Sequence, residues 1–402
     1  CSSDLDISSG SYEKTNTWLE TVNYKAGWRK YLAAAVKKEV SIPVIAANLI
    51  RSAEQAVQQI EEGTQDLIGL GRPLLADPEL PLKIKEGREE DVQRCIVCCQ
   101  CYESLLKNAW VGEPLRCSVN PTLSQIASKP ADSEGTVVVV GAGAAGLQAS
   151  LSLKERGFQV ILFEKAPRPG GQILLADKAP EKEKLGWCID DLIHAVQKAG
   201  VDLRLNTEAD ARTILDESPD AVILSTGAVP LKPSIPGVSR ETVYTFDEIL
   251  SGSRFPGKGE SVIVVGSGLT GLETAEYLLA RGCQVRVVEM ADQPAPGAHF
   301  QHRDEALETL VSQGAGILTS VKLIEIREGS IILDHTGIQE EIASDAVVLA
   351  LGSRPLNTLE KDLKDFAGVL KVIGDASEIG RIADAVEQGY RTAVELNVER
   401  AV

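Results

Sequence analysis

Two stretches of the chain repeat the same succession of residues at a fixed spacing. Thr136–Val140 runs into Gly141-Ala-Gly-Ala-Ala-Gly146, and Ser261–Val265 runs into Gly266-Ser-Gly-Leu-Thr-Gly271, 125 residues later. An apolar strand, a glycine-rich turn and a helix in this order form a dinucleotide-binding unit. The first glycine permits the tight turn, the second admits a pyrophosphate to the helix N-terminus, and the third lets helix and strand pack closely. We therefore predict two nucleotide-binding modules in an α/β fold.

The repeat continues beyond the glycines. Glu164 and Glu289 end the second strand of each copy, and Gly227 and Gly352 follow a later strand, again 125 residues apart. An acid at this position accepts hydrogen bonds from a ribose hydroxyl. The residues expected to bind the two nucleotides are Gly141, Gly143, Ala144, Ala145, Gly146 and Glu164 in the first copy, and Gly266, Gly268, Leu269, Thr270, Gly271, Glu289 and Gly352 in the second.

The end of the chain predicts how the two modules are connected. A short apolar strand ends at Gly374-Asp375 and is followed by a helix with Ala383, Val386 and Ala393 on one face. We expect this segment to return to the first module, which makes the second module an insertion. The predicted domains are 131–240 with 365–402, and 241–364.

Cysteines are concentrated before the first module. Cys95-Ile-Val-Cys98-Cys99-Gln-Cys101 is followed by Cys117, so five of the eight cysteines lie within 23 positions. A C-x2-C-x2-C loop can wrap one corner of a [4Fe–4S] cluster, with a fourth ligand from more distant sequence. We predict Cys95, Cys98, Cys101 and Cys117 as the ligands in a segment spanning 93–130, with Cys99 surplus. Two alternatives remain: a zinc site, which usually has two separated pairs, and disulfides, which suit small secreted chains.

Residues 1–92 contain three short apolar runs that end in Gly- or Asn-containing turns. The runs are Leu5–Ile7, Val44–Ala47 and Leu67–Leu70, and Ser52-Ala-Glu-Gln55 between the last two is a capping box that starts a helix. Repeated strand–helix units of this kind suggest the C-terminal part of a (β/α)8 barrel.

In such barrels the loops after the last two strands commonly bind a phosphate. Asn48, Gly71 and Arg72 stand in these loops, so they become candidate phosphate contacts. The alternative is that they cap or pair locally. A complete barrel needs about 250 residues, and we therefore expect this chain to be cut from a longer one that supplies the first strands.

Composition limits the remaining possibilities. A chain of 402 residues is expected to form two or three domains, and its net charge of −17 argues against nucleic acids and anionic membranes as partners. The sequence has no uninterrupted apolar run of about 18 residues, so no transmembrane helix is expected. We expect a cytoplasmic protein with a small-molecule substrate, and a homo-oligomer is compatible with the sequence.

The order of barrel end, cysteine loop, two glycine motifs and terminal Gly374-Asp375 resembles the 2,4-dienoyl-CoA reductase and trimethylamine dehydrogenase group. These are the iron–sulfur relatives of old yellow enzyme, and the resemblance covers essentially the whole chain, including Gly71-Arg72-Pro-Leu-Leu-Ala-Asp77. It implies FMN at the barrel mouth, one [4Fe–4S] cluster, FAD in the first module and NADH in the second. It also implies that Asn48 and Arg72 lie near the FMN phosphate.

The resemblance assigns further residues. It implies that Gly170-Gly171-Gln172 and Asp375 surround FAD. The chain departs from the group at two places. The gap between Cys101 and Cys117 holds 15 residues, which is long, and Tyr12 stands where dienoyl-CoA reductases have a catalytic His. A phenol could donate a proton as a neutral acid, although Tyr12 could equally serve only for packing.

The resemblance implies an NADH-dependent oxidoreductase in which electrons pass from NADH to FAD, the cluster and FMN, and then to an activated alkene such as an enoyl-CoA or an enone. Alternatives are an electron-transfer (diaphorase) subunit without its own substrate site, and an amine dehydrogenase of the same group. A non-catalytic nucleotide sensor is disfavoured, because a sensor has no use for the cysteine loop.

Overall fold

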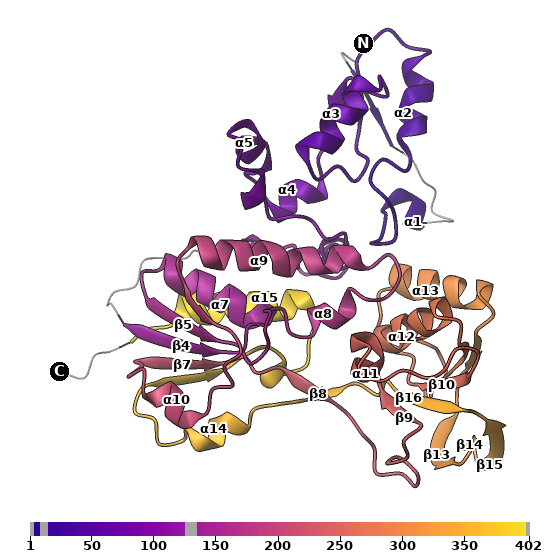
Figure 1. The fold of residues 1–402 in the computed structure, drawn as a ribbon. Coiled ribbons are helices and arrows are strands. Elements are labelled where there is room, and N and C mark those ends of the chain that lie inside the picture. The colour runs from indigo at the N-terminus through magenta and orange to yellow at the C-terminus, as the bar shows by residue number, and fades with distance from the viewer. Residues whose placement is uncertain (1–3, 9–14, 125–134, 399–402) are drawn as a thin grey trace. The chain divides into compact units, whose positions relative to one another are not determined.

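The computed structural model describes residues 4–8, 15–124 and 135–398. These residues form two compact units (Figure 1). Unit 1 comprises Cys1–Ile173, Lys184–Gly227 and Asn357–Val402, and unit 2 comprises Leu174–Glu183 and Ala228–Leu356. Among the described residues, no helix combines the length and apolar character that crossing a bilayer requires.

Unit 1 begins with a three-stranded parallel sheet of β1 (Leu5–Ile7), β2 (Val44–Ala46) and β3 (Leu67–Ile68), in that order. Its helices are α1 (Thr15–Trp18), α2 (Lys30–Lys37), α3 (Ala53–Glu61), α4 (Arg72–Ala76) and α5 (Leu80–Lys85). The hydroxyl of Ser52 accepts a hydrogen bond from the Gln55 N–H at 3.2 Å, which starts α3 as the capping residues predicted. The strand–helix–strand order is that of a barrel segment.

The first dinucleotide module has a five-stranded parallel sheet in the order β18-β7-β4-β5-β6. The strands are β4 (Thr136–Val140), β5 (Gln159–Phe163), β6 (Asp202–Arg204), β7 (Ala221–Leu224) and β18 (Val369–Val372). Helices α7 (Ala144–Glu155), α9 (Trp187–Lys198) and α15 (Ile382–Glu395) lie on one side of the sheet in Figure 1, with α10 (Ala211–Leu215) and α14 (Thr358–Asp362) on the other.

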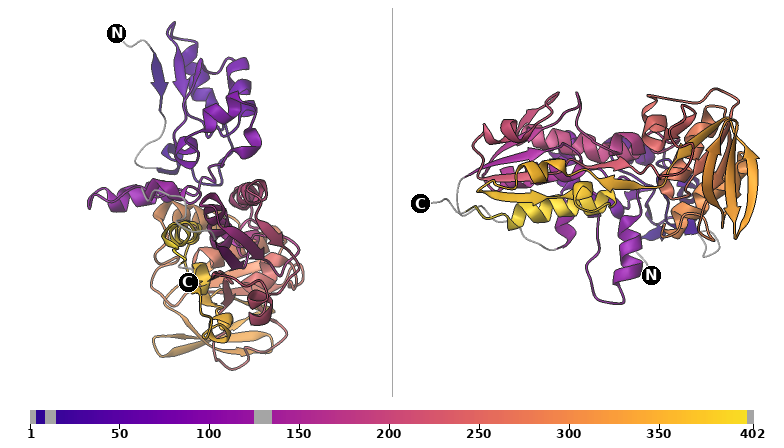
Figure 2. Two further views of the ribbon diagram at one scale, coloured as in Figure 1. Left: turned by 90° about the vertical axis from the view of Figure 1, so that its left-hand side faces the viewer. Right: turned by 90° about the horizontal axis from the view of Figure 1, so that it is seen from below.

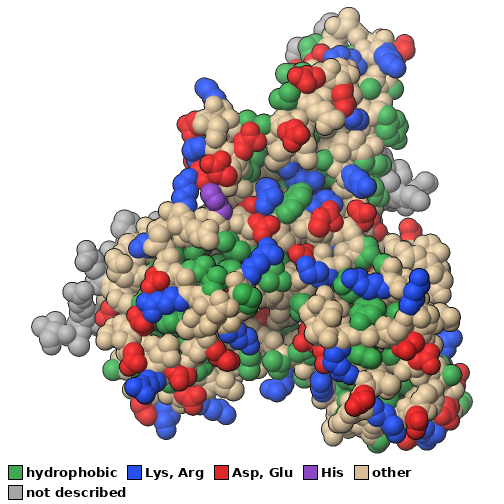
Figure 3. Space-filling model, viewed as in Figure 1, with side chains coloured by type: hydrophobic (Ala, Val, Ile, Leu, Met, Phe, Trp, Pro, Cys, Tyr) green, Lys and Arg blue, Asp and Glu red, His purple; other side chains and the backbone are tan. Residues whose placement is uncertain are grey.

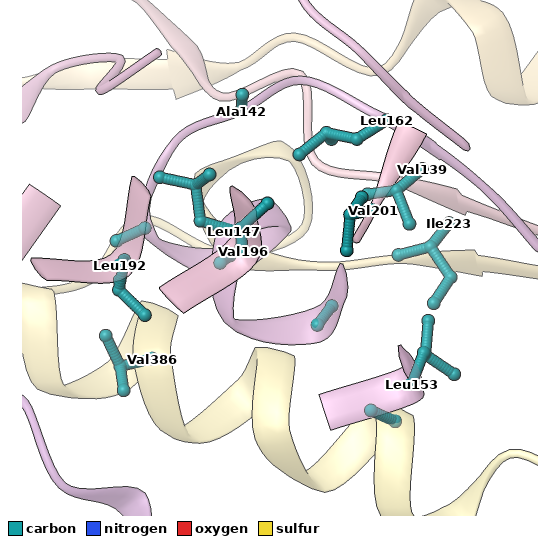
Figure 4. Packing of buried hydrophobic residues seen from close by; sticks show 14 of the residues in the cluster. Val139, Ala142, Leu147, Leu153, Leu162, Leu192, Val196, Val201, Ile223 and Val386 are labelled. Atoms are coloured by element: carbon teal, nitrogen blue, oxygen red, sulfur yellow. The ribbon is translucent and has the colours of Figure 1, made fainter. Parts of the chain in front are cut away.

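The valine run of β4 explains this layering. Val137 and Val139 pack with Leu147, Val196 and Val386 in one core, part of which Figure 4 shows from close by. Val138 and Val140 instead join a second core on the opposite side of the sheet. Alternate side chains of a strand point to opposite faces, so an unbroken valine run suits a strand that is covered on both sides.

Unit 2 repeats this architecture with a parallel sheet in the order β12-β11-β10-β16-β9. Its elements are β8 (Ala228–Pro230), β9 (Val243–Thr245), α11 (Phe246–Ser251), β10 (Ser261–Val265), α12 (Leu269–Ala280), β11 (Gln284–Val288), α13 (Phe300–Ser312), β12 (Gly316–Leu318), β16 (Ala346–Leu349) and β17 (Ser353–Pro355). An antiparallel meander of β13 (Lys322–Arg327), β14 (Ser330–His335) and β15 (Ile338–Ala343) accompanies the sheet and is orange in Figure 2.

The predicted internal repeat has a structural counterpart. The bounds of β4, α7, β5 and β7 recur 125 residues later as those of β10, α12, β11 and β16. The second module is inserted in the first, because β18 returns to pair in parallel with β7.

The chain passes from unit 1 to unit 2 between Gly227 and Ala228, and it returns to unit 1 between Leu356 and Asn357. The sequence predicted these boundaries at 240/241 and 364/365. The difference has two causes. Strands β8 and β17 pair with each other and so remain together in unit 2. Leu359 of α14 and Leu363, which follows it, pack in the core that contains Val138 and Val140 of β4. This packing assigns α14 to unit 1.

The remaining described elements are the helices α6 (Gln100–Asn108) and α8 (Ile173–Ala176) and four single turns of 3-10 helix, at Glu89–Asp91, Pro121–Ser124, Glu183–Gly186 and Gly374–Ala376. On the face shown in Figure 3, acidic and basic side chains are interspersed. The net charge of −17 is therefore not gathered into one patch on that face.

Candidate functional site: a cysteine-lined cavity and two dinucleotide turns

The cysteine loop surrounds a cavity in unit 1. All five of its cysteines line a small cavity of about 20 Å³, together with Arg72, Leu75, Ile96, Val97, Ser118 and Val119. The loop is tightly bent: Val97 and Cys99 adopt positive φ values of 55° and 56°. A β-branched residue in this conformation is strained, so the packing around the loop must hold it in place.

The thiols differ in their surroundings. Cys98 donates to the Ser118 hydroxyl at 3.1 Å, whereas Cys99 donates to the Glu20 carbonyl at 3.4 Å. Burial raises the pKa of Cys101 to about 11 and that of Cys117 to about 12. None of the seven cysteines in the described part of the chain forms a disulfide.

The geometry also bears on the kind of metal site. In the described ranges, no three His, Cys, Asp or Glu side chains are grouped as ligands of a single metal ion. The five thiols line one cavity instead.

The long gap before Cys117 is occupied by α6 and a return loop. Ser104 of α6 donates to the Cys101 carbonyl at 3.0 Å and accepts from the Arg116 N–H at 3.0 Å. Asn108 donates to the Pro114 carbonyl at 2.8 Å, which closes the loop. The 15 intervening residues thus return Cys117 to the cavity wall.

Ion pairs attach the cysteine segment to helices of the first module within unit 1. The Arg94 guanidinium lies 2.6 Å from the Asp191 carboxylate on α9, and its backbone N–H donates to the same carboxylate at 2.8 Å. Arg116 contacts Asp384 at 2.8 Å and Glu387 at 2.6 Å on α15. The cavity is therefore fixed relative to the first dinucleotide module.

The residues predicted as phosphate contacts are engaged within the chain. Arg72 donates to the Glu20 carbonyl at 2.6 Å and to the Glu20 carboxylate at 2.7 Å. The amide of Asn48 is buried and donates to Gln59 at 3.3 Å and to Gln65 at 3.4 Å. Gly71 precedes α4 with open space where a side chain would begin. Tyr12, the predicted catalytic residue, lies outside the described residues.

Glu20 was missed by the sequence analysis. Its carboxylate is buried and contacts Arg29 and Arg72, which stand 9 and 52 residues further along the chain. No local motif marks it, because only the fold brings these three side chains together.

The first glycine turn has the features of a nucleotide site. Gly141 has a φ of 99°, and open space lies where a Cβ of Gly143 would stand. Both oxygens of Glu164 accept backbone hydrogen bonds at 2.8 Å, one from Ala142 and one from Ala166. Ala144 and Ala145 are buried at the start of α7. The carboxylate is thus held at the end of β5 beside the glycine turn.

Residues from distant sequence border this turn. Gly171 approaches the Gly143 backbone, since its ideal Cβ would lie 3.2 Å from the Gly143 Cα. Gln172 donates to the Asp375 carboxylate at 3.1 Å. Burial raises the pKa of Asp375, although the N–H of Gly380 donates to it. The structure therefore brings Gly171, Gln172 and Asp375 together beside the first glycine turn.

The second glycine turn reproduces the same contacts. Glu289 accepts from the backbone N–H of Ser267 and of Ala291, each at 2.8 Å, and these are the positions equivalent to Ala142 and Ala166. The Ser267 hydroxyl adds a third hydrogen bond at 2.7 Å. Leu269 and Thr270 start α12 as their counterparts start α7, and Gly352 has a φ of 88°.

We expect Gly146→Ala to destabilise the first module by about 2 kcal/mol, because overpacking at a close contact has this typical cost. An ideal Cβ at Gly146 would lie 1.9 Å from the Gly141 carbonyl oxygen, so α7 would have to move away from β4. Thermal unfolding followed by circular dichroism measures the loss. Gly143→Ala is the matched control, because its Cβ meets no heavy atom within 4 Å. Equal destabilisation by both substitutions would contradict this account.

Comparisons with known proteins agree with this geometry. Residues 135–372 match the pyridine nucleotide-disulphide oxidoreductase family, and residues 5–91 match the NADH:flavin oxidoreductase / NADH oxidase family. An NADH oxidase of Thermoanaerobacter brockii is 40% identical over 97% of this chain and 61% of its own length. A cinnamate reductase of Clostridium sporogenes is 30% identical over 89% of this chain and 55% of its own length.

A solved structure of the same kind of enzyme superposes on nearly the whole chain. A 2-naphthoyl-CoA reductase in complex with 2-naphthoyl-CoA superposes with a TM-score of 0.91 at 27% identity, over 98% of this chain and 60% of that one. The chain spans 55% to 62% of the length of these relatives and of a metal reductase of Desulforamulus reducens. The chain belongs to the pyridine nucleotide-disulphide oxidoreductase family, and its N-terminal NADH:flavin oxidoreductase segment makes it a member of the 2,4-dienoyl-CoA reductase and trimethylamine dehydrogenase group.

Proposed function

We propose that this chain is the electron-handling part of an NADH-dependent iron–sulfur flavin oxidoreductase. In the proposed route, electrons pass from NADH to FAD, through a [4Fe–4S] cluster to FMN, and then to an activated alkene such as an enoyl-CoA or an enone. The cofactors would supply hydride transfer at the flavins and single-electron transfer at the cluster. The observation that carries the proposal is a five-cysteine cavity joined by ion pairs to a dinucleotide module.

The donor set fits an iron–sulfur cluster. Thiolates are the usual ligands of such clusters, and burial of the cavity would keep water from the sulfurs. In the proposal Cys95, Cys98, Cys101 and Cys117 hold the cluster. Arg94, clamped by Asp191, keeps the first of these cysteines against α9.

The dinucleotide turns fit their proposed ligands equally well. The N-termini of α7 and α12 would each face a pyrophosphate, and the carboxylates of Glu164 and Glu289 would receive the ribose hydroxyls. Gly171, Gln172 and Asp375 would border FAD, while Asn48, Gly71 and Arg72 would lie at the FMN phosphate. For Asn48 this role requires a change of partner, since its amide donates to Gln59 and Gln65. Arg72 has five N–H donors, so it can contact a phosphate and keep its hydrogen bonds to Glu20.

A second candidate within the group is amine oxidation. This candidate is supported by the similarity of the chain to two amine dehydrogenases. A dimethylamine dehydrogenase of Hyphomicrobium is 26% identical, and a histamine dehydrogenase of Rhizobium superposes with a TM-score of 0.88 at 25% identity. The two candidates can be separated with a protein that has the complete barrel. NADH-dependent reduction of an alkene would support the first, and reduction of an electron acceptor by a secondary amine would support the second.

For the chain itself we expect about one FAD, NADH-dependent reduction of ferricyanide, and FMN well below one per chain. The reason is that the FAD side is a complete sheet of five strands, whereas the described barrel-type sheet has three. Flavins released from the protein purified without oxygen are separated and quantified. Stoichiometric FMN would contradict the proposal for the barrel segment, and a loaded chain that fails to reduce ferricyanide with NADH would contradict the proposed route.

A further inference from the structure

A charged side chain lines the cysteine cavity. Arg72 lines the same cavity as the five cysteines, and its Nη1 lies 3.8 Å from the Cys99 sulfur. The side chain is only 12% exposed. An arginine guanidinium stays protonated in proteins, so this wall carries a positive charge.

Arg72 is paired with a buried acid, Glu20. The Glu20 carboxylate, 2% exposed, lies 2.7 Å from Arg72 through one oxygen and 3.1 Å from Arg29 through the other. The indole of Trp28 also donates to Glu20 at 3.1 Å. Glu20 therefore keeps two partners when Arg72 is removed, and a substitution at Arg72 does not strand a buried charge.

We propose that Arg72 and Glu20 are positioning residues that set the reduction potential of the cluster held in this cavity. The inference deepens the proposed function, since it requires that the cysteines bind the cluster. A cluster with thiolate ligands becomes more negative when it gains an electron. A guanidinium at the cavity wall stabilises that extra charge, and a carboxylate behind it opposes the effect, because charge interactions are strong where water is excluded.

Removing the two charges should therefore shift the reduction potential of the cluster in opposite directions. Arg72→Gln removes the nearer positive charge and should make reduction about tenfold less favourable, which is about 59 mV for one electron. Glu20→Gln removes the opposing charge and should make reduction more favourable. Arg72→Lys keeps the charge and should shift the equilibrium less than Arg72→Gln does. A role limited to holding the loop would not reverse sign between the two residues.

Arg29→Gln is the matched control. Arg29 contacts the same Glu20, and its side chain is equally exposed at 12%, but it does not line the cysteine cavity. We expect Arg29→Gln to lower the potential less than Arg72→Gln, because only Arg72 lines the cavity.

The test is an anaerobic redox titration of the full chain with dithionite, followed by electron paramagnetic resonance, after iron and sulfide have been quantified in each variant. Opposite shifts for Arg72→Gln and Glu20→Gln would support the inference. Shifts in one direction, absent shifts, or an equal effect of Arg29→Gln would overturn it. If Arg72→Gln fails to retain iron, the sign of Glu20→Gln decides. An unmutated chain that binds no iron would overturn the proposed function itself.

Discussion

Cys98→Ser is expected to leave the chain without iron and acid-labile sulfide, whereas Cys99→Ser is expected to retain both. The two residues are neighbours, but their sulfurs have different surroundings. Cys98 bonds to Ser118, next to Cys117, while Cys99 is turned to the Glu20 carbonyl and the Arg72 guanidinium. Because the Cys99 thiol donates to a carbonyl and lies beside an arginine, we expect it not to serve as a ligand although it lines the same cavity. The spacing of the loop assigns the same roles independently.

Iron and sulfide are measured in single variants prepared without oxygen, together with Cys95→Ser, Cys101→Ser and Cys117→Ser. We expect each of these three to lose the cluster as Cys98→Ser does. FAD content is the control, because the first glycine turn is not altered by any of these substitutions. Loss of iron in Cys99→Ser with retention in Cys98→Ser would mean that the register of the loop is shifted by one residue.

The same metal and sulfide measurements also separate an iron–sulfur cluster from a zinc site. A structural zinc site uses four ligands around one ion, and the chain would then contain zinc without sulfide. Metal analysis of the unmutated chain therefore tests the identity of the site, and the serine variants test its ligands.

How much the sequence could predict depended on how local each feature is. The glycine turns, Glu164 and Glu289 were predictable because each contact is made within a strand–turn–helix unit, and the hydrogen bonds of the two copies agree position by position. The return of β18 to β7 was predictable from the repeat, because the second copy stands between two parts of the first.

Contacts between distant segments were not predictable. Glu20 acquires its role only when β3 and α4 bring Arg72 beside it, across 52 residues. The boundaries of the two units were displaced for a similar reason, because the pairing of β8 with β17 and the packing of α14 are tertiary contacts. The long gap before Cys117 was a departure in the sequence, and the fold explains it by α6 and the Ser104 hydrogen bonds.

The second large effect concerns the choice of nucleotide: we expect kcat/KM with NADH to exceed that with NADPH by at least about tenfold. Glu289 is held at the end of β11 by three hydrogen bonds from Ser267 and Ala291. Burial would raise its pKa, but these hydrogen bonds lower it overall, so the carboxylate is ionised at neutral pH. A 2′-phosphate beside it would place like charges together, which costs several kcal/mol when desolvated, against about 1.4 kcal/mol per tenfold in affinity.

The cations that could relieve this repulsion are placed elsewhere. Arg286 lies three positions earlier on β11 and therefore on its opposite face, against Gly316. Arg303, on α13, is paired with Asp304 at 2.8 Å. Neither guanidinium is therefore arranged to receive a 2′-phosphate next to Glu289.

The measurement is kcat/KM for both nucleotides with ferricyanide as acceptor, in the unmutated chain, in Glu289→Ala and in Glu164→Ala. Removing the Glu289 carboxylate should reduce the preference for NADH, because the repulsion of the 2′-phosphate and a ribose hydrogen bond are lost together. Glu164→Ala changes the equivalent residue of the first module, so it should lower FAD content and leave the ratio of the two nucleotides unaltered. Equal values for NADH and NADPH in the unmutated chain would mean that Glu289 does not face the ribose, and the assignment of the second module would have to be revised.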